Sequence, residues 1–473
     1  MDFEIQTIQK SRFSTLFLPF LIFEHLYPPK VIDLGRLGLS KIVDDMLTRP
    51  SAIRWMMKFG DERNIRAMGL DPKDVISFGG GWVGHHAPER LREIYVEMSK
   101  DVTAFHQTGA YPPIPGVPAC KRELARMDEV LYGVKATEKN VIVGQSSTEL
   151  THDLMRTILN CGDDVLLLDP TYVNYYGQLV FALTNWRLCK DKGHIERLVP
   201  DAEVAYVRSF DPDSWSFMPD VDRTISDLEQ AFKLHEPKAV LIASPDNPTG
   251  QIVPQKFMEA VLELCQENNA YFVIDYAYKT QTFVDSLPEY FSWSPAELDN
   301  LILMYSASKF FRSLGRRLGW VVGPEKVIDG METMLTYSVL SADNMHQMAM
   351  AKYLEETIDN GNLRRYLNNI NESYKEAARI TVNSIDEYVG LRRTIPQGAL
   401  YVVMEVGEDG EKWTEETLRN TGVMFIPGFG FGESLRNGVR VSYGPLVENT
   451  DKIPEGMKRV GEHVKGRKSG SSE

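Results

Sequence analysis

The segment 305–320, YSASKFFRSLGRRLGW, brings an amine, hydroxyl groups and a fixed cation together over a short stretch of chain. An apolar run that reads as a strand ends just before Ser306, Lys309 follows three residues later, and Arg317 comes eight residues after the lysine. These groups suit a cofactor that carries an aldehyde and a phosphate. The lysine amine can form a Schiff base with the aldehyde, while the serine and the arginine hold the dianion. A lone lysine after a serine is more often a solvated loop residue, so this interpretation depends on the rest of the chain.

A carboxylate and an amide stand at the ends of two further apolar runs. Asp275 ends the run 271–275, and Tyr278 follows it by three residues. A carboxylate buried there is costly unless a cation pairs with it, and a protonated pyridine nitrogen would be such a partner. Asn247 begins the turn sequence Asn-Pro-Thr-Gly after the run 239–243. The ordinary alternatives are a helix cap for Asp275 and a plain turn at Asn247.

A hydroxyl-rich loop follows the apolar run 141–144. Ser146, Ser147 and Thr148 open a helical stretch that extends to about residue 159. Hydroxyls and free N–H groups at a helix N-terminus bind anions. The same residues, with Glu149, would also make an ordinary capping box.

Arg440 lies between valines in the sequence Gly-Val-Arg-Val-Ser-Tyr, residues 438–443, which predicts a strand. From a strand, its planar guanidinium could bind a carboxylate through two hydrogen bonds. The alternative is a surface arginine on an edge strand. The glycine-rich loop 427–432 and the segment 396–401, Pro-Gln-Gly-Ala-Leu-Tyr, precede this strand.

Short apolar runs alternate with helical patterns through the middle of the chain. This alternation predicts an α/β fold with a mostly parallel sheet and helices on both faces. Ligands bind beyond the carboxyl ends of the strands in such sheets, where Ser146, Asn247 and Lys309 stand. Seven strands are expected in one large doubly wound domain: 141–144, 164–168, 185–189, 239–243, 271–275, 301–305 and 318–323.

A smaller α+β domain is expected after the sheet. The pattern is long and helical to about residue 389, and the runs 400–406, 423–427 and 439–443 read as strands. The connection 190–222 is long enough to be functional or inserted, but its sequence indicates no role. The expected organisation is an N-terminal arm (1–30), the N-terminal part of the small domain (31–90), the large domain (91–345), the C-terminal part of the small domain (346–464) and a disordered tail (465–473).

The composition is that of a soluble globular enzyme, with 473 residues of which 43% are hydrophobic and 25% charged. A net charge of -14 disfavours nucleic acid or an anionic membrane surface as a partner. The four cysteines are far apart and form no Cys/His cluster, so neither a zinc site nor a disulfide framework is expected. A reducing cytoplasm is the expected compartment.

The apolar stretch 13–23, FSTLFLPFLIF, resembles the apolar region of a signal peptide. However, no small-residue cleavage site follows it, Pro19 interrupts it, and it is too short to span a bilayer as a helix. We interpret it as an arm that packs on the body of the protein or on a neighbouring subunit.

Taken in order, these motifs resemble those of the fold-type I aminotransferases, the class I and II aminotransferases, over most of the chain. The resemblance implies pyridoxal 5'-phosphate as the cofactor, held by Lys309 as a Schiff base. It implies that Asp275 contacts the pyridine nitrogen and that Asn247 and Tyr278 contact the phenolic oxygen. The phosphate ligands that it implies are Ser146, Ser147, Thr148, Ser306 and Arg317. The chain departs from the family in this loop, where a glycine is usual and Gly144 stands earlier than expected.

The resemblance also assigns roles to residues whose own patterns are weak. Tyr172 would stack on the cofactor ring, and Tyr111 would reach a phosphate across the interface of a homodimer. By themselves, these two read equally well as a core tyrosine and a turn tyrosine. Arg440 would hold the α-carboxylate of the substrate, and the glycine-rich segment that contains Gly80 and Trp82 would cover the substrate.

The activity implied is transfer of the amino group of an L-amino acid to a 2-oxo acid, with Lys309 moving the proton as a general base. Another enzyme on the same cofactor, such as a lyase, a decarboxylase, an oxidase or a cyclase, remains open, because one fold supports several reactions. A third reading is a non-catalytic module, such as the aminotransferase-like half of a transcription regulator. That reading predicts a helix-turn-helix domain and a basic face, which the N-terminal segment does not clearly contain. No second arginine stands out for a dicarboxylic substrate, although the partner subunit could supply one.

Overall fold

The computed structural model describes residues 43, 46–47, 51–160, 162–183, 186–189, 194–197 and 204–470. The chain divides into two compact units, Met1–Arg49 and Pro50–Glu473, and every element below belongs to the second. The apolar stretch 13–23 and its interpretation as an arm lie outside the described residues. Among the residues that are described, no helix has both the length and the apolar character needed to cross a membrane.

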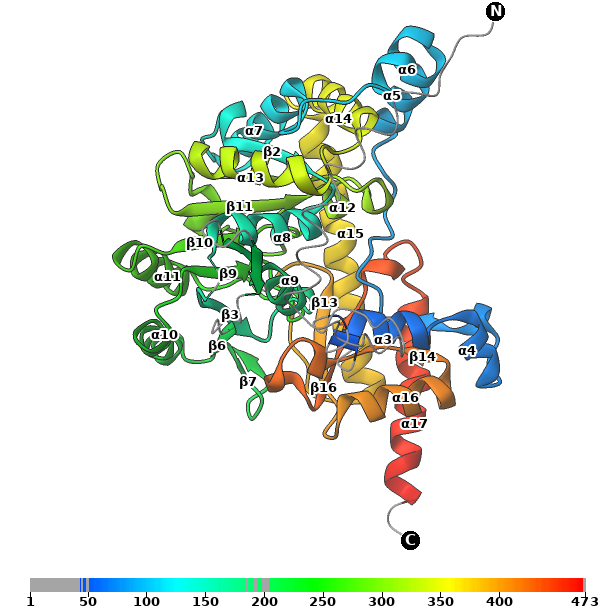
Figure 1. The fold of residues 1–473 in the computed structure, drawn as a ribbon. Helices are drawn as coiled ribbons and strands as arrows, with labels where there is room; N and C mark the ends of the chain where they lie inside the picture. The colour runs from blue at the N-terminus through cyan, green and yellow to red at the C-terminus, as the bar shows by residue number, and fades with distance from the viewer. Residues whose placement is uncertain are drawn as a thin grey trace, which may run out of the picture. The chain divides into compact units, whose positions relative to one another are not determined.

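A seven-stranded sheet with the order β2-β12-β11-β10-β9-β3-β6 forms the centre of the second unit (Figure 1). β12 runs antiparallel to both of its neighbours, and the other neighbouring strands are parallel. The expectation of a mostly parallel sheet of seven strands is therefore confirmed. Its strands are β2 (Val141–Gly144), β3 (Val165–Asp169), β6 (Val204–Arg208), β9 (Ala239–Ala243), β10 (Tyr271–Asp275), β11 (Leu301–Ser306) and β12 (Gly319–Val322).

Helices cover both faces of this sheet because successive strand residues point to opposite sides. In β3, Leu166 and Leu168 join one hydrophobic cluster, whereas Val165 and Leu167 join the other. The first cluster includes side chains of α7 (Pro118–Tyr132), α10 (Val221–His235), α11 (Gln255–Glu267) and α14 (Asn344–Thr357). The second includes side chains of α8 (Ser147–Ile158), α9 (Asn174–Leu183) and α13 (Glu325–Ser338).

One predicted strand of the large sheet is wrong. The run 185–189 forms β4 (Trp186–Cys189), which pairs antiparallel with β5 (His194–Arg197) in a separate two-stranded sheet. The seventh strand is instead β6, inside the connection 190–222 that had no predicted role. β6 buries only alternate residues, as an edge strand does, although its sequence Val-Ala-Tyr-Val is an apolar run like those of the central strands.

The smaller α+β part contains a three-stranded sheet of β13 (Tyr401–Glu405), β16 (Gly438–Ser442) and β15 (Ile426–Pro427). β1 (Ile76–Ser77) pairs in parallel with β14 (Val423–Met424), so residues from before the large sheet contact the C-terminal part. The helices of this region are α15 (Asn362–Ser384), α16 (Gly410–Thr421) and α17 (Lys452–Gly470), while α3 (Ala52–Phe59), α4 (Glu62–Ala67), α5 (Glu89–Lys100) and α6 (Val102–Thr108) precede β2. The residue limits proposed for the domains stay a prediction.

The expected disordered tail begins too early, since α17 continues to Gly470. Arg467 in its last turns pairs with Glu408 at 2.6 Å and with Glu416 at 3.3 Å. These contacts tie residues 465–470 to the small sheet region, an attachment that the local sequence does not indicate.

Candidate active site

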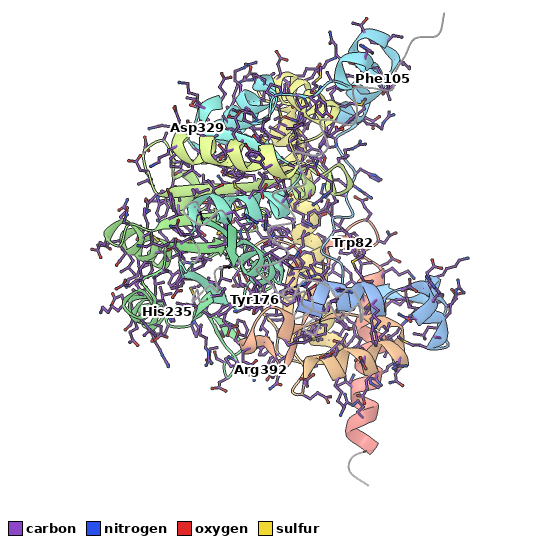
Figure 2. All side chains as sticks on the ribbon, in the orientation of Figure 1. Trp82, Phe105, Tyr176, His235, Asp329 and Arg392 are labelled. Atoms are coloured by element: carbon purple, nitrogen blue, oxygen red, sulfur yellow. The ribbon has the colours of Figure 1, made fainter. Side chains whose placement is uncertain are left out.

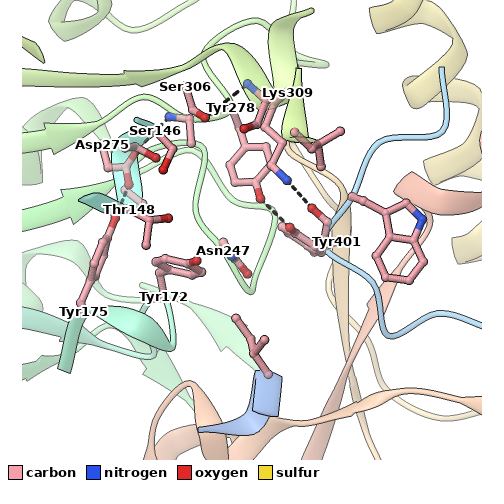
Figure 3. Close-up of a pocket in the computed structure, with 18 of the residues that line it drawn as sticks. Ser146, Thr148, Tyr172, Tyr175, Asn247, Asp275, Tyr278, Ser306, Lys309 and Tyr401 are labelled. Atoms are coloured by element: carbon pink, nitrogen blue, oxygen red, sulfur yellow. Dashed lines mark hydrogen bonds between the residues drawn. The ribbon is translucent and has the colours of Figure 1, made fainter. Parts of the chain in front are cut away.

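One cavity of about 780 Å³ collects most of the predicted site residues (Figure 3). Its size is typical of a ligand pocket, and it lies at the carboxyl ends of several parallel strands, where the fold leads one to expect a ligand. The predicted residues that line it are Trp82, Ser146, Ser147, Thr148, Tyr172, Asn247, Asp275, Tyr278, Ser306, Lys309, Arg317 and Arg440.

Lys309 lies on α12 (Ala307–Phe310), which begins directly after β11. Ser306 caps this short helix, because its Oγ accepts a hydrogen bond from the Ser308 N–H at 3.3 Å. The Lys309 Nζ donates to the carbonyl oxygen of Gly81. Desolvation by the surrounding protein, followed by the positive charges of Arg440 and Arg317, lowers the pKa of Lys309 to about 7. A substantial fraction of the amine is therefore neutral near pH 7 and able to act as a nucleophile or a base.

One end of the cavity offers hydrogen-bond donors that could hold an anion. The Arg317 Nη2 donates to the Ser146 Oγ at 2.6 Å, and no side chain caps the N-terminus of α8. Free N–H groups and a guanidinium thus face the same space. Gly319 of β12 makes this approach possible, because a Cβ there would lie 2.5 Å from the Ser147 nitrogen.

Both side chains of that pair sit on left-handed backbone. Ser146 has φ 89° and Arg317 has φ 56°, in a region that favours glycine. The sequence of this loop departs from that of the family, where a glycine is usual. The backbone at Ser146 has a conformation that suits glycine, but the residue here is a serine. Non-glycine residues persist in such conformations where the surrounding structure holds them, often at functional sites.

Asp275, at the end of β10, is a buried carboxylate without an ion-pair partner among the described residues. It accepts hydrogen bonds from the Tyr175 hydroxyl at 2.6 Å and from the Ala277 N–H at 2.9 Å. Burial raises the pKa of Asp275, and the two hydrogen bonds oppose that rise. A ligand cation would complete its environment.

Arg440, on β16, is buried with its guanidinium carbon 4.2 Å from the centre of the Tyr401 ring and 4.9 Å from that of Phe431. Its Nη1 donates to the Asn247 Oδ1 at 2.9 Å, and its Nη2 donates to the Gly79 carbonyl oxygen at 3.0 Å. Its Nε is buried with no partner. The arginine is therefore a buried cation at the pocket, held by aromatic rings and neutral groups, and no carboxylate of the described residues forms an ion pair with it.

Three tyrosines complete the polar lining. The hydroxyls of Tyr278 and Tyr401 share a hydrogen bond (Figure 3). Tyr172 meets Tyr175 edge to face, with ring centres 5.2 Å apart, and accepts a hydrogen bond from Asn174. Tyr172 therefore offers an aromatic face that lines the cavity.

Two predicted site residues do not line the cavity. Tyr111 is 86% exposed. Gly80 lies under the indole of Trp82, where a Cβ would come within 2.1 Å of the ring carbon Cζ3. The neighbouring His85 also faces away, with its Nδ1 2.7 Å from the Tyr374 hydroxyl, and burial lowers its pKa to about 4.

Several lining residues are absent from the sequence predictions. Tyr175 lies three residues after the predicted Tyr172, and Tyr401 is the last residue of the segment 396–401. Both are therefore close to motifs recognised in the sequence. Five others lie inside recognised segments without having been singled out: Gly81, Ala243, Ala277, Ser308 and Leu314. Nothing in the local sequence marks Ile53, Met57 and Ile426, because tertiary packing alone brings them to the cavity. Within the described residues, no group of three or more His, Cys, Asp or Glu side chains is placed to hold a metal ion.

A doubly wound α/β fold with a buried lysine, a buried carboxylate and two arginines at one cavity is the arrangement that the resemblance to the fold-type I aminotransferases leads one to expect. Residues 74–453 match the family Aminotransferase class I and II, and the chain belongs to this family. The resemblance stated from the motifs is confirmed, and with it the expectation of an aminotransferase.

Several known aminotransferases are similar to the chain over most of their length. The aspartate/prephenate aminotransferase of Thermus thermophilus is 26% identical over 425 residues, which cover 89% of this chain and 98% of that protein. The aspartate aminotransferase of Pyrococcus horikoshii is 25% identical over 402 residues, covering 84% and 92%. The structure of a mutant Thermus thermophilus aspartate aminotransferase has a TM-score of 0.74 and 25% identity, covering 90% of this chain and all of the other. The expected fold class is thereby confirmed.

Proposed function

We propose that the protein moves the amino group of an L-amino acid to a 2-oxo acid with pyridoxal 5'-phosphate as cofactor and Lys309 as the reactive amine. The observation that carries this proposal is the lowered pKa of Lys309, about 7, in a cavity that it shares with Asp275, Arg317 and Arg440. An amine of this kind is nucleophilic toward an aldehyde at neutral pH, and the three other charges would serve a ring nitrogen and two anions.

The residues present fit this cofactor. Ser146, Arg317 and the uncapped start of α8 offer donors to a phosphate. The unpaired Asp275 suits a protonated ring nitrogen, and Tyr172 offers a ring for stacking. Because Arg440 occupies the Asn247 carbonyl oxygen, the Asn247 amide group is the part that would donate to the phenolic oxygen, beside Tyr278.

The bound cofactor would act as an electron sink for the bond that breaks at the substrate Cα. The neutral Lys309 Nζ would take the proton from Cα and return it to the C4′ position, as a general base and then an acid. Asp275 would keep the ring nitrogen protonated. Arg440 would hold the α-carboxylate through two hydrogen bonds, so that the Cα–H bond faces the lysine.

We further infer a homodimer in the cytoplasm. Tyr111 lies outside the cavity of its own chain and is largely exposed, which supports a role at the site of a second copy, and α6 exposes Val102 and Phe105 nearby in sequence. The buried free thiols Cys120 and Cys265 are compatible with a reducing compartment.

The test is a half-reaction. Purified protein loaded with pyridoxal 5'-phosphate is mixed with each of the twenty amino acids without a 2-oxo acid, and the cofactor absorbance is followed. We expect one donor class to convert the pyridoxal form to the pyridoxamine form, and a 2-oxo acid to reverse the change.

Persistence of the pyridoxal form with release of ammonia, carbon dioxide or hydrogen peroxide would instead identify a lyase, a decarboxylase or an oxidase. Arg440→Ala serves as a second probe, because it should reduce kcat/KM for every donor. A loss confined to one substrate class would contradict its role at the α-carboxylate.

A further inference from the structure

Under the proposed function, each charged side chain that lines the cavity already has a partner on the cofactor or on the substrate α-amino acid group. Among the described residues, the charged side chains that line it are Asp275, Lys309, Arg317 and Arg440. They serve the ring nitrogen, the aldehyde, the phosphate and the substrate α-carboxylate. From the described residues of one chain, a second carboxylate on the substrate would find no free cation in the cavity, and a substrate cation would find no free carboxylate. Burying either one unpaired is unfavourable.

The lining that remains is apolar. Ile53 and Met57 of α3, Trp82, Leu314 and Ile426 of β15 form this part, which we call the apolar wall. Ile53 and Met57 lie one helical turn apart on the same face of α3, which packs against β15. The basic neighbours Arg54 and Lys58 are exposed and do not line the cavity.

Part of the apolar wall is open to water. Met57 is 68% exposed and Trp82 is 44% exposed, although both are large apolar side chains. Apolar surface of this kind at the mouth of a ligand pocket is surface that a bound apolar group would cover. Figure 2 labels Trp82 on the segment between β1 and α5.

The position of Trp82 is fixed by its own loop. Its indole packs directly over Gly80, which has no Cβ to obstruct it. Arg440 holds the loop before the tryptophan through the Gly79 carbonyl oxygen, and Arg312 holds it afterwards through the His85 carbonyl oxygen at 2.6 Å. Gly80 is therefore a positioning residue for Trp82, although it does not itself line the cavity.

We propose that the site takes amino acids with a large uncharged apolar side chain, aromatic or aliphatic, and that the apolar wall selects them over dicarboxylic amino acids. This inference rests on the proposed function, because the assignment of the four charged groups comes from it. It separates the chain from its relatives named for aspartate, and it gives Gly80 and Trp82 a definite part in specificity.

The first test measures binding without turnover. The enzyme loaded with pyridoxal 5'-phosphate is titrated calorimetrically with 3-phenylpropanoate and with succinate, which share one carboxylate and differ in the group at the other end. We expect 3-phenylpropanoate to bind at least about tenfold more tightly. Equal or tighter binding of succinate would overturn the inference.

Turnover separates this inference from the proposed function. If no amino acid transfers its amino group, the proposed function fails, whatever the two carboxylates do. If transfer occurs and aspartate or glutamate has the highest kcat/KM, the proposed function stands and the inference about the apolar wall is wrong.

Variants test the wall directly. Trp82→Ala and Gly80→Ala should each lower kcat/KM for phenylalanine roughly tenfold more than they lower it for aspartate, while Trp82→Phe should restore most of the loss for phenylalanine. Equal losses for both donors would show a structural role only and would contradict the inference.

A variant designed to accept dicarboxylic substrates tests the same inference in the opposite direction. Met57→Arg places a cation at an exposed helix position, where the fold tolerates it. It should tighten succinate binding and raise kcat/KM for aspartate. Lys58→Arg, the next residue on the same helix but outside the cavity, is the matched control and should change neither. No gain from Met57→Arg in a folded protein would count against the placement of α3 at the substrate side chain.

Discussion

At the scale of single residues, the reactivity of Lys309 comes from its surroundings. Burial and two nearby arginines lower its pKa to about 7 from the ordinary 10.5. Below pH 7 the amine is mostly protonated and unreactive toward an aldehyde, and above pH 7 it is mostly neutral. The two arginines that we propose for phosphate and carboxylate thus also lower the pKa of the amine.

We therefore predict that the rate at which the apoprotein captures pyridoxal 5'-phosphate rises with pH and levels off above a midpoint near 7. Borohydride trapping followed by peptide mass spectrometry measures the adduct at Lys309. Nα-acetyl-lysine is the control, with a midpoint near the ordinary 10.5. A protein midpoint close to that of the control would contradict the effect of burial.

The buried Asp275 depends on a single hydroxyl partner. Tyr175→Phe removes the hydrogen bond of 2.6 Å, so the pKa of Asp275 should rise further and its carboxylate should hold a ring nitrogen less well. We expect pyridoxal 5'-phosphate to bind roughly tenfold more weakly, in keeping with loss of a hydrogen bond to a charged group. Fluorescence titration measures the affinity. Tyr176→Phe, at an adjacent half-exposed tyrosine outside the cavity, is the matched control, and equal behaviour of the two variants would refute the role of Tyr175.

At the scale of elements, a buried ion pair fastens the turn after β10 to α7. Lys279, next to Tyr278, is 0% exposed, and its Nζ lies 2.9 Å from the Asp128 Oδ1. The rings of Tyr132 and Tyr276 lie 4.4 Å from the same nitrogen. The ion pair thereby fixes the end of β10 at Asp275 and the turn that carries Tyr278 against α7.

Removing one partner of this pair should be far more harmful than removing both. Lys279→Met leaves the buried Asp128 carboxylate without its cation and with the Tyr305 hydroxyl as a remaining hydrogen-bond donor, and we expect the free energy of unfolding to fall by about 3–5 kcal/mol. Adding Asp128→Leu should recover much of that loss. Urea denaturation of the single and double variants measures both. A cost below about 1 kcal/mol for Lys279→Met would mean that water or another group satisfies Asp128.

The elements also explain what the sequence could and could not predict. The central strands are buried on both faces, so they appear as continuous apolar runs and were placed correctly. β6 is half-exposed at the edge, and its short apolar run lies inside a long polar connection, where the run 185–189 has the same appearance but forms a separate hairpin with β5. The helical end of α17 depends on Arg467 and two distant glutamates, which no local pattern reveals.

At the scale of the whole molecule, the site draws on parts of the chain that lie far apart in sequence. Lys309, Asp275 and Asn247 were predictable because each lies at the end of a recognisable strand or a few residues after it. Ile53, Met57 and Ile426 were not, because the folding of α3 and β15 against each other puts them at the cavity. Sequence reasoning thus reached the groups proposed for the chemistry and missed most of those proposed to choose the substrate.

The exposure of Tyr111 leads to a prediction about the oligomeric state of the protein. If a second copy of the chain completes the phosphate site, the protein should have the mass of a dimer in light scattering, and Tyr111→Phe should weaken binding of pyridoxal 5'-phosphate about tenfold. Tyr337→Phe, at another tyrosine that is 85% exposed, is the control. A monomer with unchanged cofactor affinity in Tyr111→Phe would rule out the shared site.

The most direct measurement is the exchange of the substrate α-proton in deuterium oxide, followed by NMR with the loaded enzyme and its preferred donor. Because Lys309 is proposed to move that proton, Lys309→Ala should exchange it at least roughly a hundredfold more slowly, and added methylamine should restore part of the rate. Exchange at the wild-type rate in Lys309→Ala, with the cofactor still bound, would show that another group is the base and would contradict the proposed role of Lys309.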